Sequence, residues 1–442
     1  TLATLRQLVE RLARWKVNEL QLYVENVFRF RRHPEIGRGY SPFAPEDLLE
    51  LQEHCKRHHV RLVGSLASFG HMERILRIPK FRRLGELPGF GGHAGGTTLC
   101  PTDPEAIRFV DELYDEFVPL FEAEDFNVCC DETWELGRGR SRPRAEKAGV
   151  GRVYLAFLRK LDRLCRRRGK RTNAWADIVM QHPHLLGELP DDLVLLNWEY
   201  SAGGERIART TEIADAGRPF VVCPGTGAWQ SHGSRLDNAV ANVAEFASAG
   251  RRCGAEGLLN TDWGDDGHRN FLGVSLHGFA HGAAHAWNGE RVDDATFTRR
   301  FCRRLFGDAD GRLAAGMQRL GRTGREAGDG CGLYHALVEP LLPRSRRAGR
   351  IDRLDADGMQ RVIAELSGRD FVPRPPEGLA EFEALALREL SVAARMDVLA
   401  CRRALAAQRL RAGRRVRSSH LRRLAGETHG LAEDFRRLWR AR

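Results

Sequence analysis

The fold is indicated most clearly by the stretch FNVCCDETW, residues 126–134. This short, mostly apolar run follows the acidic segment 122–125 and ends in two adjacent carboxylates, Asp131 and Glu132. A buried strand has no place for two ionisable groups except its exposed end. In a barrel of parallel strands, the C-terminal strand ends form the active site. The pair also fits a solvated turn or a helix N-terminus, where Asp and Glu are common.

The same order of apolar run and polar end repeats along the chain between residues 17 and 268. Helical stretches, expected at 3–15, 45–58, 103–122 and 151–168, lie between the runs. Strict alternation of strand and helix predicts a parallel sheet with helical crossovers. The seven strands are expected at residues 17–25, 60–68, 126–130, 171–176, 192–197, 219–223 and 257–260. Polar or aromatic residues follow them: Glu25, His71, Asp131, Glu132, Trp175, Asp177, Trp198, Tyr200, Trp229, Trp263 and Asp265.

This pattern favours an α/β fold of the (β/α)8 TIM-barrel type. Such a barrel needs eight strands, and because this chain opens on a helix, we expect its first strand to be missing. A doubly wound open sheet is the alternative, but it would gather ligand groups mainly at one switch point. No GxGxxG motif or P-loop follows a predicted strand, which counts against a nucleotide cofactor.

The strand pattern stops after about residue 310. We therefore predict a barrel domain over residues 1–310 and a mostly helical C-terminal domain over 311–442. Helices are expected at 349–366, 379–411 and 418–439, with a linker at 373–376. No dense cluster of chemically active residues stands out in this C-terminal part, and we expect it to pack on the barrel.

The amino-acid composition is that of an ordinary soluble protein and argues against a membrane protein. The chain has 442 residues, of which 42% are hydrophobic, enough for a large core. No apolar run approaches the roughly 20 residues that span a bilayer, and the chain begins in an amphipathic helix rather than a signal peptide. We therefore expect a cytoplasmic protein without a membrane partner.

Charge and cysteine content argue against two further classes. The net charge of +11 would suit a nucleic-acid-binding protein, but the basic residues are scattered among Glu and Asp, so no nucleic-acid partner is expected. The ten cysteines do not form paired CxxC units with zinc spacing. They are interpreted as small buried residues of a reducing cytosol, and no metal is expected.

The aromatic and acidic residues at the predicted strand ends suggest a ligand. A single Trp at such a place is more often packing, but several together with carboxylates and a Tyr describe a sugar site. The C–H face of a sugar stacks on aromatic rings while its hydroxyls bind carboxylates. For His71, a buried histidine bonded to backbone is the alternative to a site residue.

Six short motifs resemble family 20 glycoside hydrolases, the β-N-acetylhexosaminidases, and most closely their bacterial intracellular branch. The resemblance covers roughly residues 2–440, and the motifs occur in family order, each at a predicted strand end. They are LYVE (22–25), SFGHME (68–73), CDETWELG (130–137), NWEY (197–200), CPGT (223–226) and TDWGDDGH (261–268).

The resemblance implies an exo-acting, retaining, cofactor-free hydrolase that acts on N-acetylhexosamine-containing glycosides. Glu132 would protonate the leaving oxygen while the 2-acetamido carbonyl of the substrate attacks the anomeric carbon, a known exception to the two-carboxylate pattern. Asp131 would hold the acetamido N–H, and Tyr200 would donate to its carbonyl oxygen. His71 would bond to the general acid. The catalytic residues implied are thus Glu132, Asp131, Tyr200 and His71.

Substrate-binding roles are implied for a second set of residues. Aromatic rings would surround the acetamido group and the sugar, and Asp265 would take ring hydroxyls. Glu25 stands where the family often has an Asp behind the histidine. The family's first strand carries an Arg that grips the sugar, and this chain begins after it. The set is Glu25, Trp175, Asp177, Trp198, Trp229, Trp263 and Asp265.

Two other functions stay open. A retaining glycosidase could pair Glu132 with a second carboxylate, Glu199 or Asp265, as a direct nucleophile. A non-catalytic sugar-binding protein or inactive remnant is the alternative from a different class, suggested by the missing strand and its Arg.

Overall fold

The computed structural model describes residues 1–442 apart from 343–347, 369–371 and 373–374, and it describes no side chain at 290 or 348. Contacts within the chain divide it into two compact units. The first contains residues 1–199, 205–223 and 248–259, and the second contains residues 200–204, 224–247 and 260–442. These borders differ from the predicted domain border at residue 310, which stays a prediction.

The first unit is built on a parallel sheet of seven strands, whose order in the sheet follows the sequence. In the doubly wound alternative the strand order would reverse at a switch point, so the sheet is of the barrel type. All seven predicted strands are confirmed. They are β1 (Glu19–Val24), β2 (Arg61–Leu66), β3 (Asp125–Asn127), β4 (Arg171–Trp175), β5 (Val194–Trp198), β6 (Phe220–Cys223) and β7 (Gly257–Leu258).

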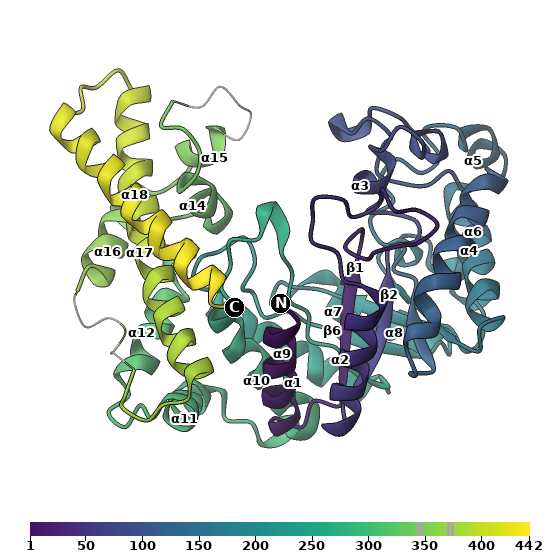
Figure 1. Ribbon diagram of the computed structural model, residues 1–442, viewed down its shortest axis with the longest axis horizontal. Helices are drawn as coiled ribbons and strands as arrows, with labels where there is room; N and C mark the ends of the chain where they lie inside the picture. Colours follow the sequence, from purple (N-terminus) through teal and green to yellow (C-terminus); the bar gives the residue numbers. More distant parts are fainter. Residues whose placement is uncertain (343–347, 369–371, 373–374) are drawn as a thin grey trace. The chain divides into compact units, whose positions relative to one another are not determined.

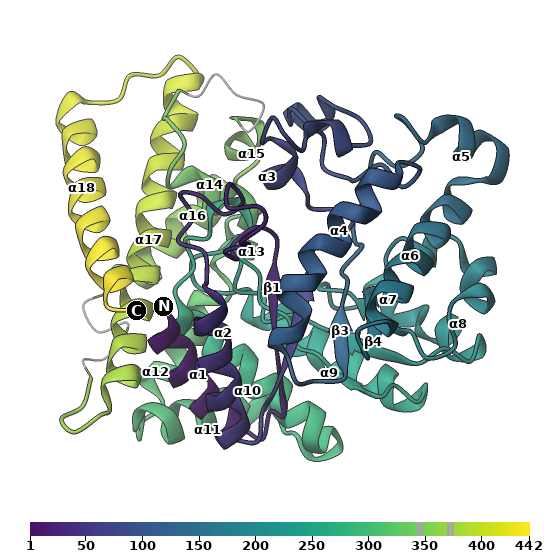
Figure 2. The same ribbon diagram turned by 45° about the vertical axis from the view of Figure 1, so that its right-hand side comes forward.

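Helices connect these strands. Figures 1 and 2 show α1 and α2 side by side next to β1, and Figure 1 shows β2 beside α2. The α-helices of this unit are α1 (Leu2–Arg14), α2 (Pro45–Arg57), α3 (Glu73–Leu76), α4 (Pro104–Phe117), α5 (Arg142–Ala148), α6 (Val150–Arg166), α7 (Glu205–Ala208) and α8 (Thr210–Asp215). The short 3-10 helices are η1 (Arg82–Leu84), η2 (Phe90–Gly92), η3 (Val118–Leu120), η4 (Val179–Gln181) and η5 (Pro183–Glu188).

Local chemistry sets the ends of α4, the helix that leads to β3. The Asp103 carboxylate accepts the Glu105 N–H at 2.8 Å and caps the start of the helix. The helix ends at Phe117 rather than near the predicted residue 122, and a 3-10 turn follows. Pro119 explains the difference, because it has no N–H to continue the α-helical hydrogen bonds.

The second unit is helical. Figures 1 and 2 show α17 and α18 packed side by side, as their contacts also indicate. Its elements are η6 (Asp265–Gly267), α10 (Leu272–Asn288), η7 (Gly289–Arg291), α11 (Asp294–Phe306), α12 (Arg312–Leu320), α13 (Thr323–Glu326), α14 (Gly330–Ala336), α15 (Ala348–Asp352), α16 (Ala356–Leu366), α17 (Glu381–Arg411) and α18 (Ser418–Arg440). Helix α9 (Leu236–Arg252) contributes residues to both units.

The predicted C-terminal helices are confirmed, with one division. The segment expected to form a single helix at 349–366 forms α15 and α16 instead. Asp355 interrupts it, because its carboxylate accepts the N–H groups of Asp357 and Gly358 and so starts a new helix. Of the predicted linker 373–376, Pro373 and Arg374 lie outside the described residues.

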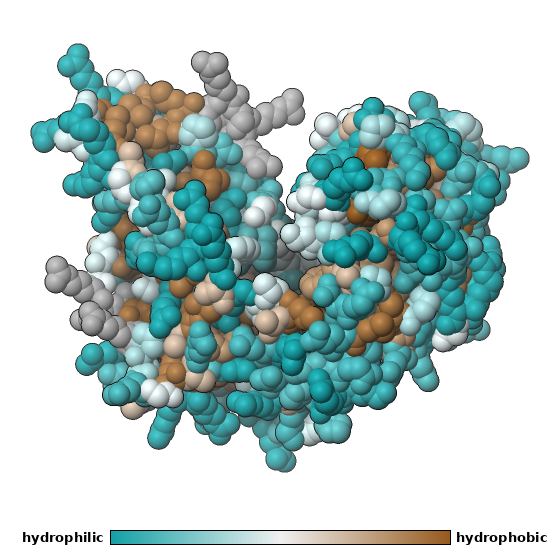
Figure 3. Space-filling view, viewed as in Figure 1, coloured by the Kyte–Doolittle hydropathy of each residue, from teal (hydrophilic) through white to brown (hydrophobic). Residues whose placement is uncertain are grey.

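The character of the surface and the burial of most cysteines are those expected from the amino-acid composition. The face shown in Figure 3 is covered mainly by hydrophilic residues, as 29% charged residues would suggest. Among the described helices, none combines the length and apolar character needed to cross a bilayer. All ten cysteines are free, and all except Cys253 and Cys331 are buried, which confirms their interpretation as small core residues.

The core below β3 is aromatic. Phe126 is fully buried and meets Tyr114 edge to face, with ring centroids 5.2 Å apart. Gly64 of β2 pairs with Phe126 in the sheet. A Cβ atom on Gly64 would lie 2.7 Å from a ring atom of Phe121 and 2.8 Å from one of Phe126. Glycine is therefore required here by packing.

We expect Gly64→Ala to lower the free energy of unfolding by about 1–3 kcal/mol, because the buried rings must shift to admit the methyl group. Urea unfolding measures this change. Gly187→Ala is the matched control, since a Cβ on Gly187 meets nothing within 4 Å, and it should change stability by no more than about 0.5 kcal/mol. Equal stability of the two variants would contradict this packing.

Candidate active site

Seven of the predicted site residues belong to the first unit and lie at or just after the C-terminal ends of its strands. Because all the strands are parallel, these ends share one edge of the sheet. Trp175 and Trp198 are the last residues of β4 and β5. The others follow strands: Glu25 after β1, His71 after β2, Asp131 and Glu132 after β3, and Asp177 after β4.

The backbone that carries the carboxylate pair is left-handed. Cys129, Cys130 and Glu132 have φ angles of 63°, 72° and 50°. For residues other than glycine this conformation costs roughly 1–2 kcal/mol each. One hydrogen bond within the segment and three from neighbouring segments hold it. The Cys129 N–H donates to Asn127 Oδ1 (2.8 Å), the Trp175 N–H to the Cys129 carbonyl (2.9 Å), the Tyr154 hydroxyl to the Cys130 carbonyl (3.1 Å), and the Glu132 N–H to Asp177 Oδ2 (3.0 Å).

A close backbone contact brings His71 to this pair. A Cβ atom on Gly70 would lie 2.1 Å from the Asp131 carbonyl oxygen, so only glycine fits before His71. His71 Nε2 lies 3.1 Å from Asp131 Oδ2 and 3.5 Å from Glu132 Oε2. Its other nitrogen, Nδ1, lies 4.0 Å from Glu25 Oε1. One imidazole thus contacts three carboxylates.

These carboxylates determine the charge of His71. Burial lowers the pKa of His71, but the hydrogen bond to Asp131 and the negative charges of Asp131, Glu25 and Glu132 outweigh it and raise the pKa to about 10. At neutral pH the ring is therefore an imidazolium that donates to Asp131. Its positive charge offsets part of the repulsion between the clustered carboxylates.

Asp131 has one oxygen in use and one without a partner. The residue is 8% exposed, and its Oδ2 is paired with His71. Its Oδ1 is buried and makes no hydrogen bond within the described part of the chain. Leaving a buried acceptor unpaired costs about 1–3 kcal/mol. The arrangement is therefore suited to accept an N–H or O–H group from a bound ligand.

The remaining residues of this group differ in exposure. Trp175 is 4% and Asp177 3% exposed. Burial and the charge of Asp131 raise the pKa of Asp177 to about 7. Trp198 is partly exposed, and the Arg206 guanidinium lies 3.9 Å from its ring centroid. This cation–π contact fixes the ring of Trp198.

Four predicted site residues belong to the second unit. Trp263 Nε1 donates to the Tyr200 hydroxyl at 2.9 Å, and the Tyr200 ring meets Trp229 edge to face at 5.0 Å. Asp265 begins η6. Gly225 allows this packing, because a Cβ there would lie 2.4 Å from Trp229. The structure thus joins Tyr200, Trp229 and Trp263 into one aromatic cluster.

Several residues that shape the first group were missed in the sequence. Asn127 lies inside the stretch 126–134 and Gly70 inside the motif SFGHME, and an Asn that ends a strand or a Gly before the His could have been noticed. Glu73, also in a motif, acts on Glu25 through its charge. Tyr154 and Arg206 lie on helices α6 and α7, where nothing in the local pattern distinguishes them.

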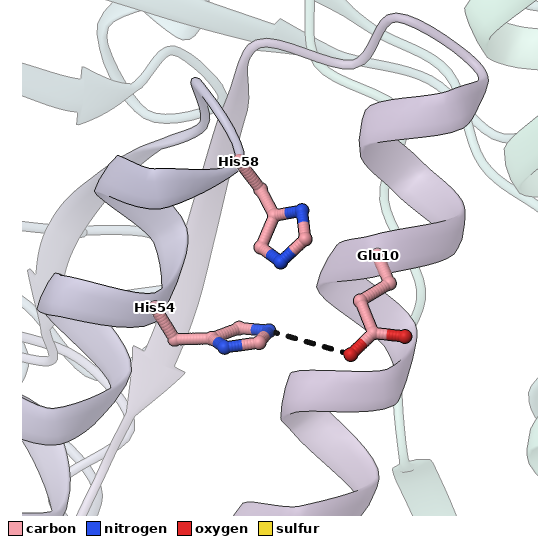
Figure 4. A group of neighbouring side chains, drawn as sticks. All are labelled: Glu10, His54 and His58. Atoms are coloured by element: carbon pink, nitrogen blue, oxygen red, sulfur yellow. Dashed lines mark ion pairs between the residues drawn. The ribbon is translucent and has the colours of Figure 1, made fainter.

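Other groups of described residues place possible metal ligands close together. In Figure 4, His54 of α2 and His58, which directly follows α2, face Glu10 of α1. His54 Nε2 donates to the Arg6 carbonyl at 3.1 Å, and Glu10 Oε2 accepts from Arg11 at 3.1 Å. The bond from His54 to Arg6 and the 3.9 Å ion pair between His54 Nε2 and Glu10 Oε1 link α1 to α2, which explains these two residues as a structural contact.

A second group lies on α10 and α11. His281 and His285 both direct Nε2 at Asp294 Oδ1, at 2.7 and 2.9 Å. Burial lowers the pKa of His281 to about 4, although Asp294 acts in the opposite direction. The Nδ1 atom of His281 is buried and finds no hydrogen-bond partner among the described residues. A metal-bound histidine normally donates from that nitrogen, so this group also fits a hydrogen-bonded link between helices better than a metal site.

We expect Glu25 to make stability depend on pH. Burial and the charge of Glu73 raise its pKa from 4.5 to about 7, against the lowering effect of His71. Between these values the folded chain keeps a proton that the unfolded chain releases, so the free energy of unfolding falls as pH rises from about 4.5 to about 7. Urea unfolding should show a steeper loss in the wild type than in Glu25→Gln, in which the raised pKa of Asp177 still contributes to the fall. Glu53→Gln, at an exposed site on α2, is the control and should behave as the wild type. A parallel pH course for wild type and Glu25→Gln would contradict the raised pKa.

Comparison with known proteins supports the sequence resemblance. The model of the glycosyl hydrolase family 20 catalytic domain matches residues 1–309. Human hexosaminidase D is 23% identical over 194 residues, which are 42% of this chain and 39% of the human protein. Bovine hexosaminidase D is 25% identical over 194 residues, 42% of this chain and 55% of that protein. The chain thus covers less than two thirds of the length of these relatives.

Solved structures show the same fold. The chitobiase of Flavobacterium johnsoniae superposes with a TM-score of 0.56 and 13% identity, covering 96% of this chain and 72% of that one. A β-N-acetylhexosaminidase from Bacteroides fragilis gives a TM-score of 0.56 and 15% identity, covering 70% and 67%. The predicted (β/α) barrel is therefore confirmed. Since the family model matches 309 of its 442 residues, the chain belongs to glycosyl hydrolase family 20.

Proposed function

We propose that this chain is an exo-acting β-N-acetylhexosaminidase that hydrolyses glycosides of N-acetylglucosamine or N-acetylgalactosamine with retention. The observation that carries the proposal is the buried Oδ1 of Asp131, which has no hydrogen-bond partner among the residues that the structure describes. A 2-acetamido N–H is the donor that this acceptor lacks. The names of the relatives, hexosaminidase and chitobiase, support the same substrate class.

In the first step the acetamido carbonyl oxygen of the substrate attacks the anomeric carbon. The bond from that carbon to the leaving oxygen breaks, and Glu132 gives its proton to the leaving oxygen. The product of this step is a cyclic oxazolinium ion. In the second step Glu132 takes a proton from water, which attacks the anomeric carbon and reopens the ring. Two inversions give net retention.

Asp131 supplies the electrostatic part of this mechanism. Positive charge develops on the acetamido nitrogen as the ring closes, and a carboxylate at that nitrogen stabilises the transition state more than the bound substrate. The His71 imidazolium, 3.1 Å from Asp131 Oδ2, holds the carboxylate in place. Its contact with Glu132 at 3.5 Å links the same ring to the general acid.

Other parts of the prediction extend this proposal. The family resemblance gives Tyr200 the acetamido carbonyl and Asp265 the ring hydroxyls, and these roles stay predictions. A cytoplasmic location is favoured by the ten free cysteines. No feature of the site calls for a cofactor in the mechanism above.

Hydrolysis of chromogenic glycosides tests the proposal directly. The chain should release 4-nitrophenol from the β-glycosides of N-acetylglucosamine or N-acetylgalactosamine. It should leave the matched β-glucoside intact, because a 2-hydroxyl cannot form the oxazolinium ring. Turnover of the glucoside at a similar rate would favour the two-carboxylate alternative, and no turnover of any substrate would favour a sugar-binding protein.

We expect Asp131→Asn to lower kcat by about 10²–10³-fold with little change in KM, since it removes a charge interaction made chiefly in the transition state. The amide keeps the size of the side chain. Steady-state kinetics on the preferred N-acetylhexosaminide measures both constants. An unchanged kcat, with a covalent glycosyl adduct on Glu199 or Asp265 in the mass spectrum, would overturn the role of Asp131.

A further inference from the structure

Glu132 occupies a backbone conformation that its own residue type does not favour. Its φ angle is 50°, two residues after Cys130 at 72°. The direction of the Cα–Cβ bond, and hence the place of the carboxyl group, follows from this backbone. A relaxation to negative φ would swing the side chain away from His71, which it now approaches to 3.5 Å.

Asp177 is the side chain that holds this residue. It follows β4 by two positions, and its Oδ2 accepts the Glu132 N–H at 3.0 Å. Asp177 is 3% exposed, and its Oδ2 is already engaged by this backbone N–H. Its contact with the general acid is made through backbone.

We propose that Asp177 is a positioning residue, which fixes the left-handed backbone of Glu132 and thereby aims the general acid at the leaving oxygen, rather than a sugar ligand. This inference rests on the proposed function, because it needs Glu132 to be the acid. It assigns Asp177 an effect on proton transfer and little effect on sugar binding.

The test uses the dependence of the rate on the leaving group. A good leaving group such as 2,4-dinitrophenolate departs with little protonation, whereas the sugar alcohol of chitobiose needs it. The constant kcat/KM reports the steps up to the first cleavage in both cases. Glu132→Gln gives the reference for losing the acid: a large loss on chitobiose and a small one on the dinitrophenyl glycoside.

We expect Asp177→Ala to lower kcat/KM on chitobiose by about 10²-fold and on the dinitrophenyl N-acetylglucosaminide by less than about tenfold. Asp177→Asn keeps an oxygen that can accept the Glu132 N–H, and it should recover most of the activity on chitobiose. If Asp177→Ala does not fold, Asp177→Ser replaces it, since its shorter side chain does not reach the Glu132 N–H.

Asp162 provides the matched control. It is 5% exposed and accepts the Thr172 hydroxyl at 2.8 Å near the start of β4. Asp162→Ala should lower stability and reduce the rates on both substrates by the same factor, because it acts on folding alone. Thermal unfolding of each variant separates loss of folded protein from loss of rate.

The outcomes distinguish the positioning role of Asp177 from the proposed hydrolase function on which it rests. An equal loss on both substrates in Asp177→Ala, or no recovery in Asp177→Asn, would overturn the positioning role while the wild type still hydrolyses N-acetylhexosaminides. A wild type that hydrolyses neither substrate would overturn the proposed function itself. A loss confined to chitobiose, together with recovery by Asn, would establish Asp177 as the residue that aims Glu132.

Discussion

The left-handed backbone after β3 is the constraint on which the rest of the candidate site depends. It turns the chain sharply at Cys129 and Cys130, so that Asp131 and Glu132 face His71 instead of continuing the strand. Strain of this kind persists only where the surroundings hold it. Here β4, α6 and the segment after β4 each contribute a hydrogen bond. The seven-stranded sheet acts as the rigid frame that brings those three segments to one edge.

The sheet also brings several charged side chains together at this edge. Three carboxylates surround one imidazole, and the site keeps them there by making that imidazole a cation. The arrangement opposes folding, since burial and like charges raise the pKa of both Glu25 and Asp177. A charge stabiliser in turn needs a carboxylate that is held in a fixed place, as the contact with His71 holds Asp131. The clustered carboxylates therefore lower the free energy of unfolding at the edge of the sheet that carries the proposed active site.

The sequence predicted the sheet well, because short apolar runs with polar ends are a direct consequence of buried parallel strands. The same rule, that polar residues follow buried strands, predicted the strand ends at which the seven candidate residues of the first unit lie. The sequence did not predict the left-handed backbone at Cys129, Cys130 and Glu132, because neither Cys nor Glu indicates a positive φ. It also did not predict the hydrogen bonds that hold this backbone. The bonds from Tyr154 and Asp177 join residues 24 and 45 positions from their partners, and only the fold brings these together. The predicted helix boundaries were wrong at two places. Both differences could have been predicted, because Pro119 cannot continue an α-helix and Asp355 can cap the start of a new one.

In the proposed mechanism the substrate's own acetamido oxygen is the nucleophile. The most direct test of this mechanism is the rate on a series of glycosides whose N-acetyl group carries none, one, two or three fluorine atoms. Each fluorine withdraws electrons and weakens the carbonyl oxygen as a nucleophile, while the leaving group and sugar stay the same. We expect a steep, stepwise fall of kcat/KM along the series. A rate that does not change with fluorination would show that a protein carboxylate attacks instead.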